Sequence, residues 1–291
     1  MPKETSPRVT VRLATPDDAA VCGRICYEAF CRINAEHNFP CDFPDPERPI
    51  GLLSMLFSRP DYYCVVAEVD GCLVGSNCLD HRSLIYGVGP ITVDPSAQNL
   101  GAGRKMMEAA IEHARERNAA GVRLVQAAFN SHSLALYTSL GFDAREPLSC
   151  LQGRTTQRSI PGCSVRPARM EDFDACNAVS RRVHGFERNI EMSQAIEAGS
   201  AMLVERGDRI TGYATSLSFF GHGAAECNAD MQALLASAES FGGSGILVPT
   251  RNAELMRWCL ANGLKIVQPM TLMTMGLYNE PAGSWFSSIL F

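Results

Sequence analysis

Residues 93–107 have the sequence VDPSAQNLGAGRKMM, and this stretch decides the fold. A strand-like run ends here, a turn follows, and a glycine-rich loop then opens a helical pattern. The first amides of a helix lack intrahelical acceptors and lie at the positive end of its dipole. Gly101 and Gly103 let an anion approach the backbone, and Arg104 and Lys105 add positive charge. The stretch therefore predicts a phosphate-binding loop at the start of a helix.

The two glycines are consistent with more than one kind of loop. A bare Gly-x-Gly also occurs in an ordinary helix cap that contains glycines by chance. The dinucleotide fingerprint requires a third glycine three residues after Gly103, where Met106 stands. The Walker loop requires Gly-Lys followed by Ser or Thr, and no such sequence occurs. Neither of the two common nucleotide loops therefore matches.

The residues around this stretch alternate between strand and helix patterns. We expect strands over residues 9–14, 62–69, 72–79, 84–93, 122–129 and 142–151, and helices over 15–32, 50–58, 101–118 and 131–140. Asp70-Gly71 predicts a hairpin turn, and residues 34–50 predict a loop. This order is typical of an α/β (more narrowly α+β) fold, in which a mixed twisted sheet is flanked by helices.

The pattern begins again after residues 153–163. Val165-Arg166 with acids at 171–172 matches Val11-Arg12 with acids at 17–18, and a second hairpin is expected over 201–205 and 209–218, followed by a helix over 225–239. Asn130 precedes Gly141 by 11 residues, as Asn252 precedes Gly263. Chance similarity of two halves is the alternative to an internal duplication. We expect domains over 1–152 and 164–291, with residues 153–163 as a linker.

The loop motif resembles a known family. Gln98-x-x-Gly101-x-Gly103 is similar to the acyl-CoA pyrophosphate loop of the GNAT superfamily of acetyl-CoA-dependent N-acetyltransferases. The resemblance is strong over residues 8–152, and residues 163–277 resemble the family only as a degenerate copy. It implies two tandem GNAT-like domains, of which the second is degenerate.

A second motif extends the resemblance. Asn130, Ser133 and Tyr137 precede Gly141-Phe142 with the spacing of the family's later helix, which contacts CoA and carries a tyrosine. Tyr137 would then contact the cofactor and protonate the leaving thiolate; on spacing alone it also suits a core aromatic. Asn130 would bond the pantetheine arm or a phosphate, a role compatible with a simple helix cap.

The resemblance implies direct transfer of an acetyl group from acetyl-CoA, the co-substrate, to a primary amine. The backbone of the loop would bind the pyrophosphate, through Gln98, Asn99, Leu100, Gly101, Ala102, Gly103 and Arg104. Ile91, Thr92 and Val93 would pair with the pantetheine arm, and one amide there would polarise the thioester carbonyl. Pro90 lacks an N–H and suits a strand that splays from its neighbour.

The general base is left open. The strand over residues 86–91 carries no acid, although the family often places a carboxylate on its central strands. Asp80 and His81 are the local candidates, and His37, Asp42 and Asp45 lie in the loop expected to cover the amine; each also suits a solvated surface. A water chain is a further route for the proton.

The second copy departs from the motif. It has no Gln-x-x-Gly-x-Gly, and Trp258 lies six residues after Asn252, whereas Tyr137 lies seven after Asn130. We expect this copy to bury surface, complete the substrate cleft or form a homodimer. His222 lies between glycines and suits either substrate contact or a plain loop. The apolar tail over residues 278–291 is expected to dock on the protein.

Composition limits the partners. The chain of 291 residues is 46% hydrophobic, with a net charge of −5, which predicts a globular protein without nucleic-acid or membrane partners. Residues 1–7 lack a signal-peptide core, so the 12 cysteines are expected to be reduced, mostly buried cytoplasmic thiols with no metal site. The acceptor is then a small-molecule or peptide amine. A non-catalytic acyl-CoA sensor and a scaffold are the alternative functions.

Overall fold

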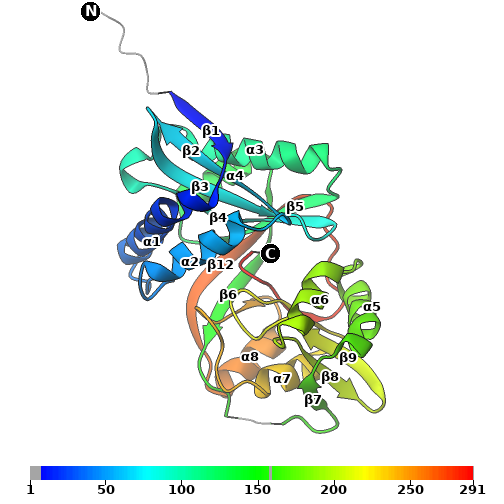
Figure 1. Cartoon of the computed structure of the whole chain (residues 1–291). Helices are drawn as coiled ribbons and strands as arrows, with labels where there is room; N and C mark the ends of the chain where they lie inside the picture. Colours follow the sequence, from blue (N-terminus) through cyan, green and yellow to red (C-terminus); the bar gives the residue numbers. More distant parts are fainter. Residues whose placement is uncertain (1–7, 157–158, 291) are drawn as a thin grey trace, which may run out of the picture. The chain divides into compact units, whose positions relative to one another are not determined.

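The computed structural model describes residues 8–156 and 159–290 (Figure 1). The polar N-terminal residues 1–7, two residues of the expected linker and Phe291 lie outside the described residues. The chain forms two compact units, residues 8–81 with 86–122 and residues 82–85 with 123–290. Both combine β-sheet and α-helices, so the expected mixed α/β class is confirmed.

The first unit contains most of the first copy. Its strands are β1 (Val9–Leu13), β2 (Tyr62–Val69), β3 (Cys72–Asp80) and β4 (Ile85–Val93), and its helices are α1 (Ala19–Glu36), α2 (Glu47–Phe57) and α3 (Ala102–Glu116). β1, β2, β3 and β4 pair antiparallel in that order. Asp70 (φ 49°) and Gly71 (φ 81°) form the expected hairpin turn, because both backbones are left-handed.

The alternation of β2 assigns its two faces to different helices. Tyr62, Cys64 and Val66 pack with buried residues of α1 and α2. Val65 and Ala67 pack with Ala102 and Met106 of α3. Successive strand residues point to opposite faces, so the sheet carries helices on both sides.

Two helix boundaries differ from the expectation. α1 continues to Glu36 because the side chain of buried Asn34 donates to the Pro40 carbonyl (2.9 Å), which orders the segment after the helix. α2 begins at Glu47 rather than residue 50, because Pro49 is tolerated in the first turn of a helix. A disulfide joins Cys31 to Cys41 across the α1–α2 loop, so the expectation of uniformly reduced thiols is wrong.

The second unit contains the end of the first copy and all of the second. Its strands are β5 (Gly121–Ala127), β6 (Asp143–Gln152), β7 (Ser164–Pro167), β8 (Met202–Arg206), β9 (Arg209–Ala214), β10 (Gly223–Ala225), β11 (Ile246–Pro249), β12 (Lys265–Gly276) and β13 (Ser284–Phe286). Its helices are α4 (Ser131–Ser139), α5 (Phe173–His184), α6 (Asn189–Glu197), α7 (Asn228–Ala236) and α8 (Ala253–Ala261). The expected helix over 225–239 is shorter, because Ala225 belongs to β10; the expected strand over 209–218 ends at Ala214.

The last strands of the two copies are exchanged. β12 ends the second copy but lies beside β5 of the first, and β6 ends the first copy but pairs with β11 and β12 of the second. Figure 1 shows β12 (orange) running along β6 (green). Leu148 and Leu151 of β6 are buried at this exchange. Both strands therefore find their hydrogen-bond partners in the other copy.

The two copies repeat one polar network. Arg12 donates from Nη1 and Nη2 to Asp18 (both 2.8 Å) and from Nε to Glu68 (2.9 Å). Arg166 donates from Nη1 and Nη2 to Asp172 (2.7 and 2.8 Å) and from Nε to Glu205 (3.0 Å). Matching residues of matching elements make matching bonds, which supports the duplication inferred from the sequence.

The ion pair between Arg12 and Asp18 is expected to make the free energy of unfolding depend on pH at acidic pH. Hydrogen bonds from Arg12 lower the pKa of buried Asp18 to about 2, so the charged form is stabilised in the folded state. Its contribution is present above pH ~4 and is lost as pH falls from ~4 through ~2. We expect Asp18→Asn to lower the free energy of unfolding by about 1–2 kcal/mol at neutral pH, a value discounted for the solvent exposure of Arg12.

Urea unfolding at neutral pH and near pH ~2 checks this expectation. The exposed neighbour provides a matched control, because Asp17→Asn is expected to change the unfolding free energy by less than about 0.5 kcal/mol. A destabilisation by Asp18→Asn that persists unchanged near pH ~2 would contradict the assignment.

Candidate cofactor loop

The predicted phosphate loop forms the entry to α3. Residues 94–101 connect β4 to α3, and Asp94 opens the turn by accepting hydrogen bonds from the Ser96 amide (2.7 Å) and hydroxyl (2.6 Å). Asn99 (φ 66°) and Gly101 (φ 88°) are both left-handed. Alternation of left-handed residues before a helix turns successive amides toward one side, which is the geometry of an anion-binding nest.

The amides of this entry precede the helical hydrogen bonds. The Lys105 amide donates to the Gly101 carbonyl (3.1 Å), a bond that closes the first turn of α3. Asn99, Leu100 and Gly101 are exposed, so their backbone is accessible from solvent. A β-carbon built on Gly101 meets no atom within 4 Å, which leaves open space over the loop. These features fit the pyrophosphate of an acyl-CoA.

One of the two basic residues expected at the loop is directed elsewhere. The Lys105 ammonium donates to the Val9 carbonyl of β1 (2.8 Å), so it is held on the edge strand. The contribution of Lys105 to the positive charge near the glycines stays a prediction. Arg104 is exposed in the first turn of α3 and stays a predicted contact.

The strand before the loop is irregular at Pro90. Ile91, Thr92 and Val93 pair with Asn77, Ser76 and Gly75 of β3, but Leu79 pairs with Val88, so β4 carries an extra residue at Gly89-Pro90. A bulge bends a strand and increases its twist. The expected splay of this strand stays a prediction, and the bulge is the local feature that would produce it.

Two polar residues that support the loop were missed in the sequence. Asn77 is 1% exposed, and its side-chain amide donates to the Met106 carbonyl (3.3 Å), which ties β3 to the first turns of α3. Asp94 caps the turn through Ser96. The Asp-Pro-Ser sequence carried a signal for the cap, since Asp before Pro is typical of such starts. An isolated Asn within a strand carried none.

Asn130, Ser133 and Tyr137 lie on α4 in the second unit. The Asn130 carboxamide oxygen accepts from the Ser133 amide (3.1 Å), so the residue is the helix cap. The Ser133 hydroxyl donates to Gln126 of β5 (2.9 Å). The roles of Asn130 and Ser133 toward a cofactor stay predictions, which the cap geometry permits.

Tyr137 is the buried residue of α4. Its side chain is 6% exposed and packs edge-on against Phe142, with the ring centroids 6.2 Å apart. Burial raises the pKa of the phenol well above its ordinary value, so it keeps its proton at all physiological pH. The environment therefore suits both a core aromatic and a proton donor.

The candidate bases are engaged in local bonds. His81 contacts the Pro60 carbonyl through Nε2 (3.0 Å) and His113 through Nδ1 (3.4 Å). His37 contacts the Ile33 carbonyl (2.9 Å), and Asp45 accepts from the Arg48 amide (3.1 Å). Asp80 is buried at the end of β3, opposite Gly87 of β4. Of the five candidate bases, Asp80 is the buried one, and it lies beside β4, as a base near the central strand would.

The second copy has no room for an equivalent loop. Only residues 226–227 separate β10 from α7, whereas residues 94–101 separate β4 from α3. β13 pairs with β10, and the Ser287 amide donates to the Leu247 carbonyl of β11 (2.9 Å). The C-terminal segment thus fills the place between β10 and β11, and the expectation that the tail docks on the protein is confirmed for its described residues.

Three further residues of the second copy have structural roles. Asn252 caps α8 by accepting from the Leu255 amide (3.2 Å), as Asn130 caps α4, and Trp258 packs against the core of this copy. His222 is 3% exposed and contacts the Tyr213 hydroxyl (3.2 Å). Burial lowers its pKa well below the ordinary value, so it is a neutral core residue rather than a solvated loop histidine.

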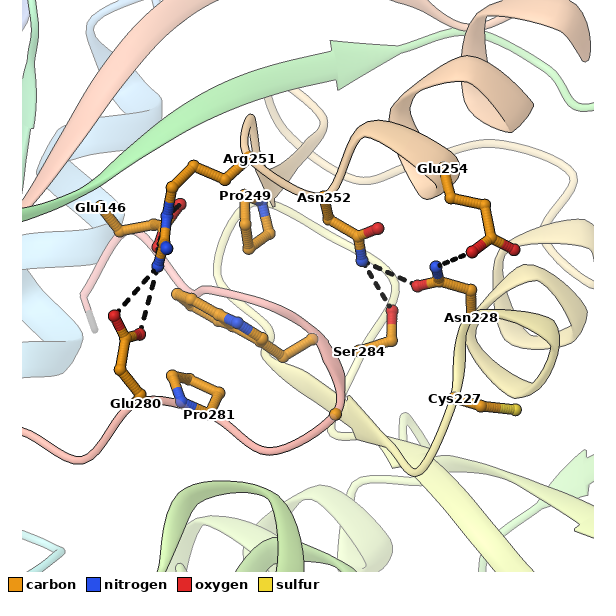
Figure 2. Close-up of a pocket in the computed structure, with 12 residues that line it drawn as sticks. Glu146, Cys227, Asn228, Pro249, Arg251, Asn252, Glu254, Glu280, Pro281 and Ser284 are labelled. Atoms are coloured by element: carbon orange, nitrogen blue, oxygen red, sulfur yellow. Dashed lines mark hydrogen bonds and ion pairs between the residues drawn. The ribbon is translucent and has the colours of Figure 1, made fainter.

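A cavity of about 480 Å³ lies in the second unit and contains none of the residues predicted to bind cofactor (Figure 2). Arg251 forms ion pairs with Glu146 (2.5 Å) and Glu280 (3.1 Å) on one side. On the other, Asn252 donates to Asn228 (2.7 Å), which donates to Glu254 (2.9 Å). The one cation of this lining is paired and the remaining charge is negative, so the cavity does not suit a pyrophosphate.

Metal sites and membrane spans are both absent from residues 8–156 and 159–290. Within these ranges no group of three or more His, Cys, Asp or Glu side chains is arranged to hold a metal ion. The helices there are too short or too polar to cross a bilayer.

Comparisons with known proteins relate part of the chain to a family of acetyltransferases. Residues 27–142 match the model of the Acetyltransferase (GNAT) family. Mycothiol acetyltransferase from Thermomonospora curvata is 41% identical over 78 residues, which is 26% of this chain and 26% of that protein. The chain thus matches about a quarter of that relative's length.

Solved structures resemble the whole chain in fold. A candidate acetyltransferase from Pyrococcus horikoshii superposes with a TM-score of 0.68 at 19% identity, covering 95% of this chain and 94% of that one. A GCN5-related N-acetyltransferase from Sphaerobacter thermophilus gives a TM-score of 0.61 at 15% identity, covering 95% and 98%. These likenesses show a shared fold over both copies. The family match thus covers residues 27–142, whereas the likeness in fold extends over both copies.

Proposed function

We propose that the chain transfers the acetyl group of acetyl-CoA directly to a primary amine of a small molecule or peptide. The observation that carries the proposal is the entry to α3. Left-handed Asn99 and Gly101 precede the first turn of α3, and the space over Gly101 is open. Such an entry binds the phosphates of a CoA-type molecule.

The residues of this chain would act mainly by positioning. The amides of residues 98–104 hold the pyrophosphate, and the backbone of residues 91–93 orders the pantetheine arm and polarises the carbonyl. The amine nitrogen then forms its bond to the carbonyl carbon and loses a proton to water, the carbon–sulfur bond breaks, and Tyr137 gives its proton to the departing sulfur. A thiolate whose thiol has a pKa of about 8.5 takes a proton from an ordinary phenol of pKa about 10 at a modest cost, which the burial of Tyr137 increases.

Amine-dependent release of CoA from acetyl-CoA tests the proposal. A panel of small polyamines, amino sugars, amino acids and N-terminal peptides is offered to the full chain. We expect at least one class to raise release above the rate of acetyl-CoA hydrolysis. The Gly103→Glu variant, which should not bind the co-substrate, serves as the inactive control.

An acyl-CoA sensor without transferase activity is the second candidate. It is favoured by the local engagement of His81, His37 and Asp45, which leaves few groups to deprotonate an amine. Micromolar binding of acetyl-CoA with no stimulation by any amine of the panel would support the sensor and overturn the transferase.

A further inference from the structure

Two thiols, an arginine and an aspartate meet in the second unit. Arg206 Nη2 lies 3.2 Å from the Cys227 sulfur and 3.8 Å from the Cys163 sulfur. The same nitrogen donates to Asp230 (2.8 Å), which is 1% exposed. Both sulfurs therefore lie beside the same guanidinium group, although 64 positions separate the two cysteines in the sequence.

Positive charge lies beside the Cys227 sulfur. Cys227 is the N-cap residue of α7, where the helix dipole is positive. Its thiol donates to the Asp230 carboxylate (3.2 Å), and the Arg206 guanidinium lies 3.2 Å from the same sulfur. A helix N-terminus and an adjacent arginine are the features that distinguish reactive from inert cysteines.

Accessibility also separates this pair from the buried cysteines. Seven free cysteines are buried, whereas Cys163 and Cys227 are half-buried. In Figure 2 the Cys227 sulfur points away from the other cavity residues. The thiol therefore faces Arg206 rather than the cavity. The Arg206 side chain is half-exposed, so a small reagent can approach the thiol from that side.

We propose that Cys227 and Cys163 form a redox-active dithiol that reacts with low-molecular-weight disulfides. The Cys227 thiolate attacks one sulfur of the small disulfide, forms a mixed disulfide and releases one small thiolate. The Cys163 thiolate then attacks the Cys227 sulfur and releases the second. Two protein thiols are oxidised to one protein disulfide, and the small disulfide is reduced to two thiols.

The order of attack follows from the neighbours of each sulfur. Burial and the Asp230 carboxylate raise the pKa of the Cys163 thiol, which makes it the poorer attacker of an external disulfide. Once the mixed disulfide has formed, its attack is intramolecular and gains from a high effective concentration. Cys227 is thus the attacking thiol and Cys163 the resolving one.

Dithiodipyridine tests the proposal on the reduced full chain, with peptide mapping of the products. In wild type we expect a Cys163–Cys227 cross-link, two thiopyridones released for each cross-link, and no label left on either residue. In Cys163→Ser we expect the label to remain on Cys227. Exposed Cys72 is the internal control, because it should keep its label in both proteins.

The role of Arg206 is tested by the rate at which dithiodipyridine labels Cys227. Arg206→Gln should slow the labelling of Cys227 roughly tenfold, Arg206→Lys should restore most of the rate, and labelling of Cys72 should not change. Label that remains on Cys227 in wild type overturns the resolving role of Cys163. A Cys227 rate that is equal in wild type and Arg206→Gln overturns the activated thiol, and with it the proposal.

Discussion

Replacing Tyr137 by Phe is expected to lower kcat about a hundredfold while leaving the dissociation constant of acetyl-CoA nearly unchanged. The variant removes one oxygen atom from a side chain that is 6% exposed, so the packing against Phe142 is kept. The departing thiolate would then have to take its proton from water. Turnover and calorimetric binding, measured with the acceptor that the amine panel identifies, give the two quantities.

The pH profile adds a second check on Tyr137. Because burial raises the phenol pKa well above its ordinary value, the proton donor stays loaded as pH rises, and no loss of kcat from its ionisation is expected below about pH 10. Tyr213→Phe is the matched control, since Tyr213 is a second fully buried tyrosine. Equal kcat in wild type and Tyr137→Phe would show that Tyr137 is a core aromatic only.

A chain ending at residue 152 is expected not to fold. In the full protein β6 pairs with β11 and β12, both of which come from the second copy. Truncation leaves the edge of β6 unpaired and exposes Leu148 and Leu151, which are otherwise buried. We expect no cooperative thermal transition and no binding of acetyl-CoA.

The two halves produced together provide the control. Fragments 1–156 and 159–291 retain every strand partner, so they should assemble and bind acetyl-CoA like the intact chain. A truncated 1–152 chain with a cooperative transition and wild-type affinity would show that the exchange is dispensable, and that residues 1–152 form a domain in their own right.

Local features of the fold could be predicted because local chemistry determines them. Asp70-Gly71 specified a turn since both positions need left-handed backbone, and Asn130 and Asn252 specified helix caps. The glycine loop was recognisable for the same reason. Its function depends on backbone conformation within a few residues.

Features that depend on distant partners could not be predicted. β6 and β12 have ordinary strand patterns, and nothing in either sequence states which copy supplies the neighbour. Lys105 was expected to add positive charge near the loop, and nothing in the sequence indicated that its ammonium donates to the Val9 carbonyl. The pairing of Cys31 with Cys41 was equally hidden, because twelve scattered cysteines permit many pairings.

The second copy keeps the framework of the first copy but has a shorter connection before its helix α7. The Arg166 network and the Asn252 cap repeat the bonds of Arg12 and Asn130, so the framework is unchanged. Only residues 226–227 precede α7, and β13 pairs with β10. The sequence alone predicted that the second copy lacks the glycine-rich loop, but it did not predict that β13 pairs with β10.

Calorimetric titration with acetyl-CoA and with CoA tests the central claim most directly. The comparison uses wild type, Gly103→Glu, and Gly51→Glu as a control, since Gly51 is an exposed helical glycine of the same unit with no atom within 4 Å of a built β-carbon. We expect micromolar binding to wild type and Gly51→Glu, and a loss of at least about a hundredfold in Gly103→Glu, where a carboxylate would meet the pyrophosphate. Equal affinity in all three proteins, or no binding to wild type, would contradict a cofactor site at residues 98–104.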